Sequence, residues 1–233
     1  MLQTKNPDRL FSKANQLAHE GEYKKAIEIF KALLQSEPSN AECMIRLAVA
    51  YFHSGDYSNV ISITSGYLKL EPKAPFVHQL RGRAFFKLEE MELSLDEFNL
   101  EIKKNPNYAE VLSDRAYTLL ELNRADEAME SATQASLIDP KLPDAFNCMA
   151  IASNQQGHYI VAMERCLEAI ELDSSNPNFC RTLGDILYNQ EDFKKVVKYN
   201  LSKALLDKKV KALEICNKYY QEVYEKRNRN LEE

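Results

Sequence analysis

Residues 7–40 read PDRLFSKANQLAHEGEYKKAIEIFKALLQSEPSN, and the rest of the chain repeats this stretch. Sliding the sequence along itself brings the pattern back every 34 residues, so prolines recur at one place: Pro38, Pro72, Pro106 and Pro140. A fixed period of this length is typical of a solenoid built from stacked supersecondary units. The pattern predicts six units without an insertion: 7–40, 41–74, 75–108, 109–142, 143–176 and 177–210.

Each unit contains two runs of apolar residues with helical spacing. In the first unit, Leu10, Ala14 and Leu17 recur every three or four residues, and the second run contains Ala26, Ile29, Phe30 and Leu33. Gly21 lies between the runs and can adopt the left-handed backbone of a turn. The unit is therefore predicted to be a helix-turn-helix hairpin, with helices over residues 7 to about 20 and about 24 to 36.

One position in every first helix carries a small residue: Ala14, Ala48, Gly82, Ala116, Ala150 and Gly184. The matching position in every second helix is never larger than Val: Ala26, Val60, Ser94, Ala128, Ala162 and Val196. Helix propensity disfavours Gly inside a helix, so these positions indicate a close crossing of two helix axes. Larger residues are predicted to fill the space around the crossing: Leu17, Tyr51, Phe85, Leu119 and Leu187.

The units also share an aromatic residue near the turn, as in Tyr23, Tyr57, Tyr159 and Phe193, and a proline two residues before the unit ends. This combination resembles the tetratricopeptide repeat, at its 34-residue period. The resemblance covers residues 7 to about 210. It implies an all-α, right-handed α-α superhelical solenoid of six hairpins that acts in protein binding.

The sequence departs from the family pattern mainly in its last two units. No Trp is present, and Ser174 and Lys208 occupy positions where earlier units have Pro. Ser153 and Asn200 occupy positions where larger apolar residues are expected. The resemblance is therefore weakest over the fifth and sixth units, and it supports their packing least.

Several residues are typical of helix ends. Asn40 is a predicted N-cap, and Pro75, Pro143 and Pro177 are each predicted to lie in the first turn of a helix, where Pro is tolerated. The turns contain Gly21, Gly55, Gly157 and Asn123, which accept a left-handed backbone, but Glu89 and Glu191 are poorer choices. After the repeats, residues 209–227 are predicted to form an amphipathic capping helix, and residues 228–233 a frayed polar tail.

The charge of the chain is unevenly distributed. The total is −5, with 45% hydrophobic and 28% charged residues, which is typical of a folded globular protein. Residues 194–211 contain seven Lys and one Asp, a net charge of +6, which leaves −11 for the rest of the chain. Nucleic-acid binding would need a basic stripe along the array, and we expect no nucleic-acid partner.

The cysteines and the N-terminus favour a reducing compartment. The five cysteines are far apart and lack metal-ligand spacing, so we expect buried, reduced thiols: Cys43, Cys148, Cys166, Cys180 and Cys216. The first residues, MLQTKNPDRL, lack the apolar core of a signal peptide, and no run approaches the roughly 20 residues of a membrane span. We expect a cytoplasmic protein without a membrane partner.

No residue pattern predicts catalysis. The four histidines are scattered, at His19, His53, His78 and His158, and the sequence has no phosphate-binding glycine loop and no nucleophile elbow. We therefore expect a protein that is not an enzyme and that has no cofactor and no metal site.

The predicted binding surface is the concave groove that the first helices line. Its candidate residues are Phe11, Asn15, Ile45, Val49, Phe52, Phe76, Gln79, Arg83, Phe86, Tyr117, Asn147, Asn154 and Arg181. In the first three units these residues are largely apolar and aromatic around one Arg, whereas in the last three they are polar. An exposed set of this many aromatic residues would form an apolar patch, which favours a partner segment that covers it.

Chaperone-binding members of the resembled family hold a C-terminal carboxylate with Lys, Asn and Arg side chains. Asn15 matches one of those places, but the others hold Phe11, Arg46, Phe76 and Leu80, so this function is not carried over. The leading hypothesis is a scaffold or adaptor that binds an apolar or aromatic protein segment. The alternative is a homo-oligomer, in which the basic end of one copy meets the acidic body of another.

Overall fold

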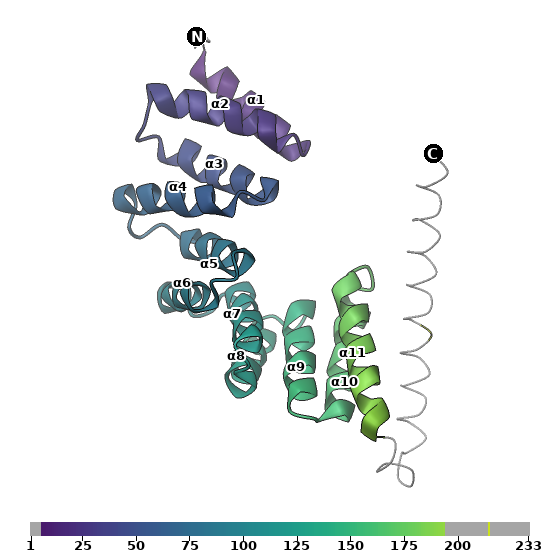
Figure 1. The fold of residues 1–233 in the computed structure, drawn as a ribbon. Coiled ribbons are helices and arrows are strands. Elements are labelled where there is room, and N and C mark those ends of the chain that lie inside the picture. The colour runs from purple at the N-terminus through teal and green to yellow at the C-terminus, as the bar shows by residue number, and fades with distance from the viewer. Residues whose placement is uncertain (1–5, 194–213, 215–233) are drawn as a thin grey trace, which may run out of the picture. The chain divides into compact units, whose positions relative to one another are not determined.

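The computed structural model describes residues 6–193 and residue 214 (Figure 1). The described residues form α-helices without strands, which confirms the predicted all-α class. The helices are α1 (Pro7–His19), α2 (Tyr23–Ser36), α3 (Ala41–Ser54), α4 (Tyr57–Leu70), α5 (Val77–Lys87), α6 (Met91–Lys104), α7 (Ala109–Glu121), α8 (Ala125–Ile138), α9 (Pro143–Gln155), α10 (Tyr159–Leu172) and α11 (Pro177–Phe193).

The helices pack as tandem hairpins. Each of α1, α3, α5, α7 and α9 packs against the helix that follows it, and α11 packs against α9 and α10. Helices α1 and α3 also contact each other, as do α7 and α9. The contacts group the chain into two compact units, Met1–Pro106 and Asn107–Glu233, so the division falls between the third and fourth repeats.

The small residues lie where the helices of a hairpin cross, as predicted. Ala14, Ala48, Ala116 and Ala150 are buried, and Gly82 is the clearest case. A Cβ atom on Gly82 would lie 2.6 Å from Cε1 of Phe98, which is itself buried. The Ser94 hydroxyl donates a hydrogen bond to the carbonyl of Gly82 at 2.9 Å, so the two backbones approach closely here.

Each compact unit has its own apolar core. In Met1–Pro106 the core surrounds the fully buried Phe30 and includes Leu47 and Tyr51. In Asn107–Glu233 it surrounds the fully buried Phe179, with Met163 and Leu183. These residues lie at the helical periods that the sequence showed, because each hairpin buries its apolar face against its neighbours.

Most of the predicted helix ends are confirmed. The Asn40 side chain accepts a hydrogen bond from the Cys43 backbone N–H at 2.9 Å, and Pro143 and Pro177 begin α9 and α11. The glycine turns and Asn123 have positive φ, and so does Glu89, at +62°. A left-handed backbone disfavours a side chain by about 1–2 kcal/mol, so the third hairpin turn is strained.

The prediction for Pro75 is wrong. Helix α5 begins at Val77, and Phe76 precedes it with a left-handed backbone at φ +64°. The Phe76 N–H donates to the Glu101 side chain at 3.2 Å, so a residue 25 positions further along the chain determines this helix start.

Several predictions concern residues outside those described. They are the second helix of the sixth repeat, the basic residues 194–211, the capping helix 209–227, the tail 228–233 and Cys216.

Candidate functional site

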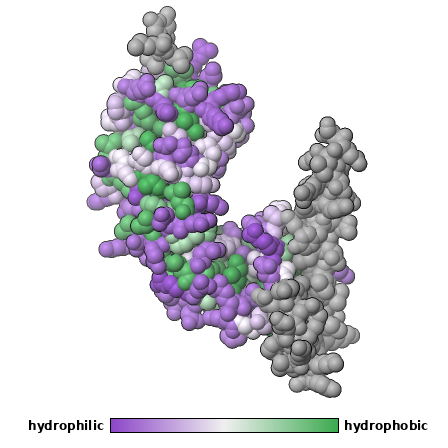
Figure 2. All heavy atoms as spheres, in the orientation of Figure 1, coloured by the Kyte–Doolittle hydropathy of each residue, from purple (hydrophilic) through white to green (hydrophobic). Residues whose placement is uncertain are grey.

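The first helices of the Met1–Pro106 unit carry the exposed side chains of the predicted groove. Phe76 is 51% exposed and Val49 is 39% exposed, and Arg83 is also exposed. In Figure 2, hydrophobic residues reach the surface between hydrophilic ones in the part of the view that α5 and α6 occupy. Phe76 immediately precedes α5, with a left-handed backbone, and Arg83 lies on α5 seven residues further along the chain.

A buried polar network on α6 holds the start of α5 in place. Glu101 is 1% exposed and accepts a hydrogen bond from the Phe76 N–H. Glu97 accepts a hydrogen bond from Nε of Arg81 at 2.9 Å, and its carboxylate lies 2.7 Å from the His78 ring nitrogen. Charge-assisted hydrogen bonds of this kind are strong and geometrically specific. The network therefore fixes the backbone that presents Phe76 to solvent.

Two of the predicted groove aromatics pack partly into the core. The Phe11 ring lies edge-on against Phe30, with centroids 5.8 Å apart. The Phe52 ring lies edge-on against Tyr57 at 5.4 Å and against His53 at 5.9 Å. These rings, although half-buried, have a packing role in addition to any role in binding.

The remaining candidates of this unit differ in exposure. Asn15, Ile45 and Phe86 are half-buried and contribute part of their surface to the first-helix face. Gln79 is only 7% exposed, so it offers almost no surface to a ligand.

Two candidates in the Asn107–Glu233 unit, Tyr117 and Asn147, form an internal link rather than an open surface. Asn147 is 1% exposed and donates to the Tyr117 hydroxyl at 2.8 Å, which in turn donates to the Asp144 carboxylate at 3.1 Å. Burial, with the nearby Asp144 charge, raises the pKa of Tyr117 well above its usual range. This network joins α7 to α9. Asn154 is half-buried, and Arg181 is exposed and donates to the Asn178 side chain at 3.0 Å.

The cysteine prediction is confirmed for the residues described. Cys43, Cys148, Cys166 and Cys180 are buried thiols. Burial raises the pKa of Cys43 to about 11, with a smaller effect from Glu37 and Glu42. Such thiols stay protonated near neutral pH and pack as small apolar side chains.

The described part of the chain contains no candidate metal site and no candidate membrane-spanning helix. Among residues 6–193, no group of three or more His, Cys, Asp or Glu side chains is placed to hold a metal ion. None of the helices described is long and apolar enough to cross a membrane.

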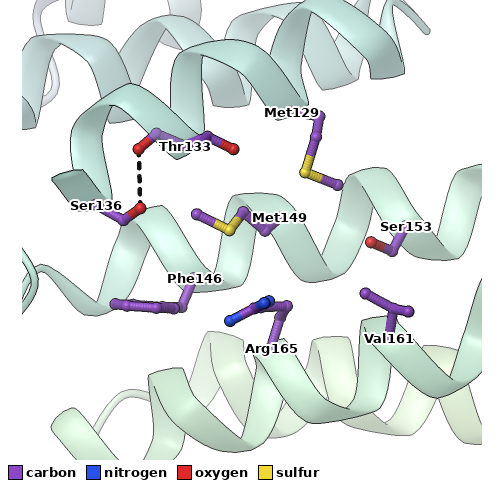
Figure 3. Close-up of a pocket in the computed structure, with 8 residues that line it drawn as sticks. All are labelled: Met129, Thr133, Ser136, Phe146, Met149, Ser153, Val161 and Arg165. Carbon is purple, nitrogen blue, oxygen red and sulfur yellow. Dashed lines mark hydrogen bonds between the residues drawn. The ribbon is translucent and has the colours of Figure 1, made fainter.

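One surface feature was not identified from the sequence. A crevice of about 270 Å³ lies between α8 and α10, with α9 as its floor (Figure 3). It is lined by Met129, Thr133, Ser136, Phe146, Met149, Ser153, Val161 and Arg165. The signal in the sequence was Ser153, a small residue where the other repeats carry a large one.

Comparison with known families agrees with the hairpin architecture. Residues 17–84 match one tetratricopeptide repeat model, and residues 109–142 match a second one. The chain is a tetratricopeptide repeat protein. The second match coincides with the predicted fourth unit, and the packing of α1 to α11 is that of tandem tetratricopeptide hairpins.

Relatives of this tetratricopeptide repeat protein are larger than the chain itself. "Small glutamine-rich tetratricopeptide repeat-containing protein 2" from Mycosarcoma maydis is 32% identical over 83 residues, which are 36% of this chain and 24% of that protein. "DnaJ homolog subfamily C member 3 homolog" from Dictyostelium discoideum is 23% identical over 196 residues, 76% of this chain and 39% of that protein. The chain thus spans well under half the length of these relatives.

Solved tetratricopeptide repeat structures share the fold. YrrB, described as a TPR protein with an unusual peptide-binding site, superposes with a TM-score of 0.62 at 18% sequence identity. The match covers 81% of this chain and 94% of YrrB. At this level of identity the likeness establishes the solenoid fold class alone.

Proposed function

We propose that this protein is a non-enzymatic scaffold that binds an apolar or aromatic segment of a partner protein. The binding surface is the face that α1, α3 and α5 form in the Met1–Pro106 unit. The observation that carries this proposal is Phe76, a large aromatic side chain that is half exposed although its backbone is strained. Strained residues persist where the surrounding structure holds them, and they cluster at functional sites.

The composition of this face suits a protein ligand. Aromatic and Arg side chains are the usual energetic anchors of interfaces, each worth roughly 2 kcal/mol or more when truncated. Phe76 supplies the aromatic anchor at the start of α5, and Arg83, exposed on α5, supplies a guanidinium for a carboxylate or a backbone carbonyl. Further apolar surface on the first helices comes from Val49 and Ile45 on α3 and from Phe86 on α5.

The tetratricopeptide fold supports a role in protein interaction in general, since proteins of this family bind protein or peptide partners. The buried, protonated thiols suit a reducing compartment, and we propose that the protein works in the cytoplasm. We propose no cofactor and no catalytic residues.

The test compares recovered partners for three proteins expressed in the native cell. Phe76→Ala combined with Arg83→Glu removes both anchors from exposed positions, so melting should stay close to wild type. Leu137→Ala is the matched control, because Leu137 is an exposed apolar residue on α8 in the other compact unit. Chemical crosslinking followed by mass spectrometry should recover partners with wild type and with the control but not with the double variant.

If the double variant recovered the same partners as wild type, the first-helix face of α1, α3 and α5 would not be the binding surface. Hydrogen exchange on the double variant, with protection in α5 and α6 equal to wild type, shows that the loss is not caused by unfolding.

A further inference from the structure

The crevice between α8 and α10 is the most distinctive feature of the second compact unit. Its floor is a stripe on α9, where Phe146, Met149 and Ser153 are spaced three and four residues apart. Met129 of α8 and Val161 of α10 face each other across one end, next to Ser153 (Figure 3). Val161 is 44% exposed, so apolar surface is open to solvent at this end.

The 34-residue period shows what normally fills this space. Subtracting three periods from Ser153, Arg165 and Ser136 gives Tyr51, Ile63 and Leu34. All three belong to the packed core cluster of the first unit, together with Ile27, the equivalent of Met129. Between α2 and α4 the seam is therefore filled by a ring and two branched apolar side chains.

In the fourth and fifth repeats these three places hold two hydroxyls, of Ser136 and Ser153, and the guanidinium of Arg165. Position 153 in particular carries Ser where the second, third and fourth repeats carry Tyr51, Phe85 and Leu119. The backbone of the repeat is retained, because α9 still packs against both α8 and α10. The volume of the missing side chains therefore remains open, as a crevice with an apolar floor. Such a space is unusual, because protein interiors are close-packed.

The rim of the crevice carries one positive group. Arg165 is the charged residue among the lining side chains that the structure describes, and its Nη1 donates to Glu168 at 2.8 Å. Both side chains of this pair are more than 40% exposed, at 42% and 43%. Exposed ion pairs contribute little, so an incoming carboxylate can share or replace Glu168 at small cost.

We propose that this crevice is a second binding site, and that it takes a protein segment in which an aromatic side chain lies next to a carboxylate. The aromatic ring occupies the place that Tyr51 fills in the second repeat, between Met129, Met149 and Val161. The carboxylate pairs with Arg165 through two parallel N–H donors, the arrangement that guanidinium favours. This site lies on a different compact unit from the proposed first-helix face, and neither proposal depends on the other.

Methionine methyl groups provide a direct readout on the full chain. Met129 and Met149 line the crevice, whereas Met44 and Met91 lie in the other compact unit and serve as internal controls. Titration of methyl-labelled protein with N-acetyl-phenylalanine, which combines a ring and a carboxylate, should shift the Met129 and Met149 resonances saturably. The amide of the same compound should bind roughly two- to fivefold more weakly, since it lacks the ion pair with Arg165 and a pair at an exposed Arg contributes little.

Two variants separate the ring from the charge. Ser153→Leu restores a side chain of the kind found at Leu119, so it should raise the melting temperature and abolish the shifts. Arg165→Gln keeps the ring site and should make the acid and its amide bind equally. Arg124→Gln is the control, because it removes a similar ion pair, with Glu127, at a residue that does not line the crevice, and it should leave both affinities unchanged.

The proposal fails if Met129 and Met149 do not shift, if Met44 shifts equally, or if Ser153→Leu still binds the acid. Two other occupants are distinguishable. If dilution of the protein alone moved the two resonances, a second copy would fill the crevice. If Tyr220→Ala, a change within the predicted capping helix 209–227, moved them with no compound added, the occupant would be the C-terminal part of the same chain. Either result overturns the peptide site.

Discussion

Replacing Gly82 by Ala tests the close helix crossing on which the hairpin depends. The added Cβ would lie 2.6, 2.8 and 2.9 Å from three ring atoms of Phe98, all inside the distance that real Cβ atoms keep. Phe98 is 1% exposed, so its ring cannot move without disturbing the core. Overpacking of this kind destabilises a protein by about 1–3 kcal/mol.

A second glycine provides a matched control. Gly66 lies inside α4 of the same compact unit, and a Cβ there would meet the flexible end of Met44 at 3.1 Å. Both Gly→Ala changes gain about 1 kcal/mol of helix propensity, so this gain cancels when the two variants are compared. Gly82→Ala should therefore be less stable than Gly66→Ala by about 1–3 kcal/mol.

Urea unfolding followed by circular dichroism measures this difference. In thermal melts it corresponds to about 2–12 °C, since 1 kcal/mol shifts the melting temperature of a protein of this size by about 2–4 °C. Phe98→Leu combined with Gly82→Ala should show a favourable coupling energy, because the smaller side chain relieves the clash. Equal stability of the two glycine variants would refute the close crossing of α5 and α6 at Gly82.

Four further outcomes are expected. Burial raises the pKa of Cys43 to about 11, so between about pH 9 and 11 only the unfolded protein ionises this thiol. The free energy of unfolding should therefore fall as the pH rises through this range, and Cys43→Ala should remove this part of the pH dependence in urea titrations. Asn40→Ala should lower the stability by about 1 kcal/mol in the same assay, through loss of the α3 N-cap. Phe76→Gly should leave the melting temperature unchanged or raise it, since Gly relieves the left-handed strain. Phe30→Ala should lower the stability by about 3–5 kcal/mol, because Phe30 is fully buried. If both variants lost the same stability, Phe76 would lie in the core. If copies associate through opposite charges, light scattering should show oligomers that dissociate as salt rises from about 0.01 to 0.15 M, and a monomer at every salt concentration would exclude this alternative.

The sequence alone determined the architecture of the repeats. The 34-residue period, the paired small residues and the glycine turns are local patterns that recur along the chain. Each further unit therefore adds evidence for the same helical hairpin. Gly82 at a crossing and Asn40 as an N-cap could be predicted because each follows from neighbours a few residues away or from the next helix of the same hairpin.

Contacts between residues far apart in the sequence determined which side chains reach the surface. The start of α5 at Val77 depends on Glu101, whose carboxylate accepts the Phe76 N–H from the other helix of the hairpin. The burial of Gln79 and Asn147 depends on side chains of neighbouring helices, which periodicity along one helix does not reveal. Groove residues and buried residues share the same spacing, so spacing could not separate them.

The crevice shows the same division between sequence and tertiary structure. Ser153 was recognisable as a departure from the repeat, because the other units define what the position normally holds. Whether the neighbouring helices close over a missing side chain or leave its space open depends on how α8, α9 and α10 pack together. The identity of one residue does not determine this, because the free energy of closing the space depends on the packing of all three helices. Only the tertiary structure shows that the space remained open.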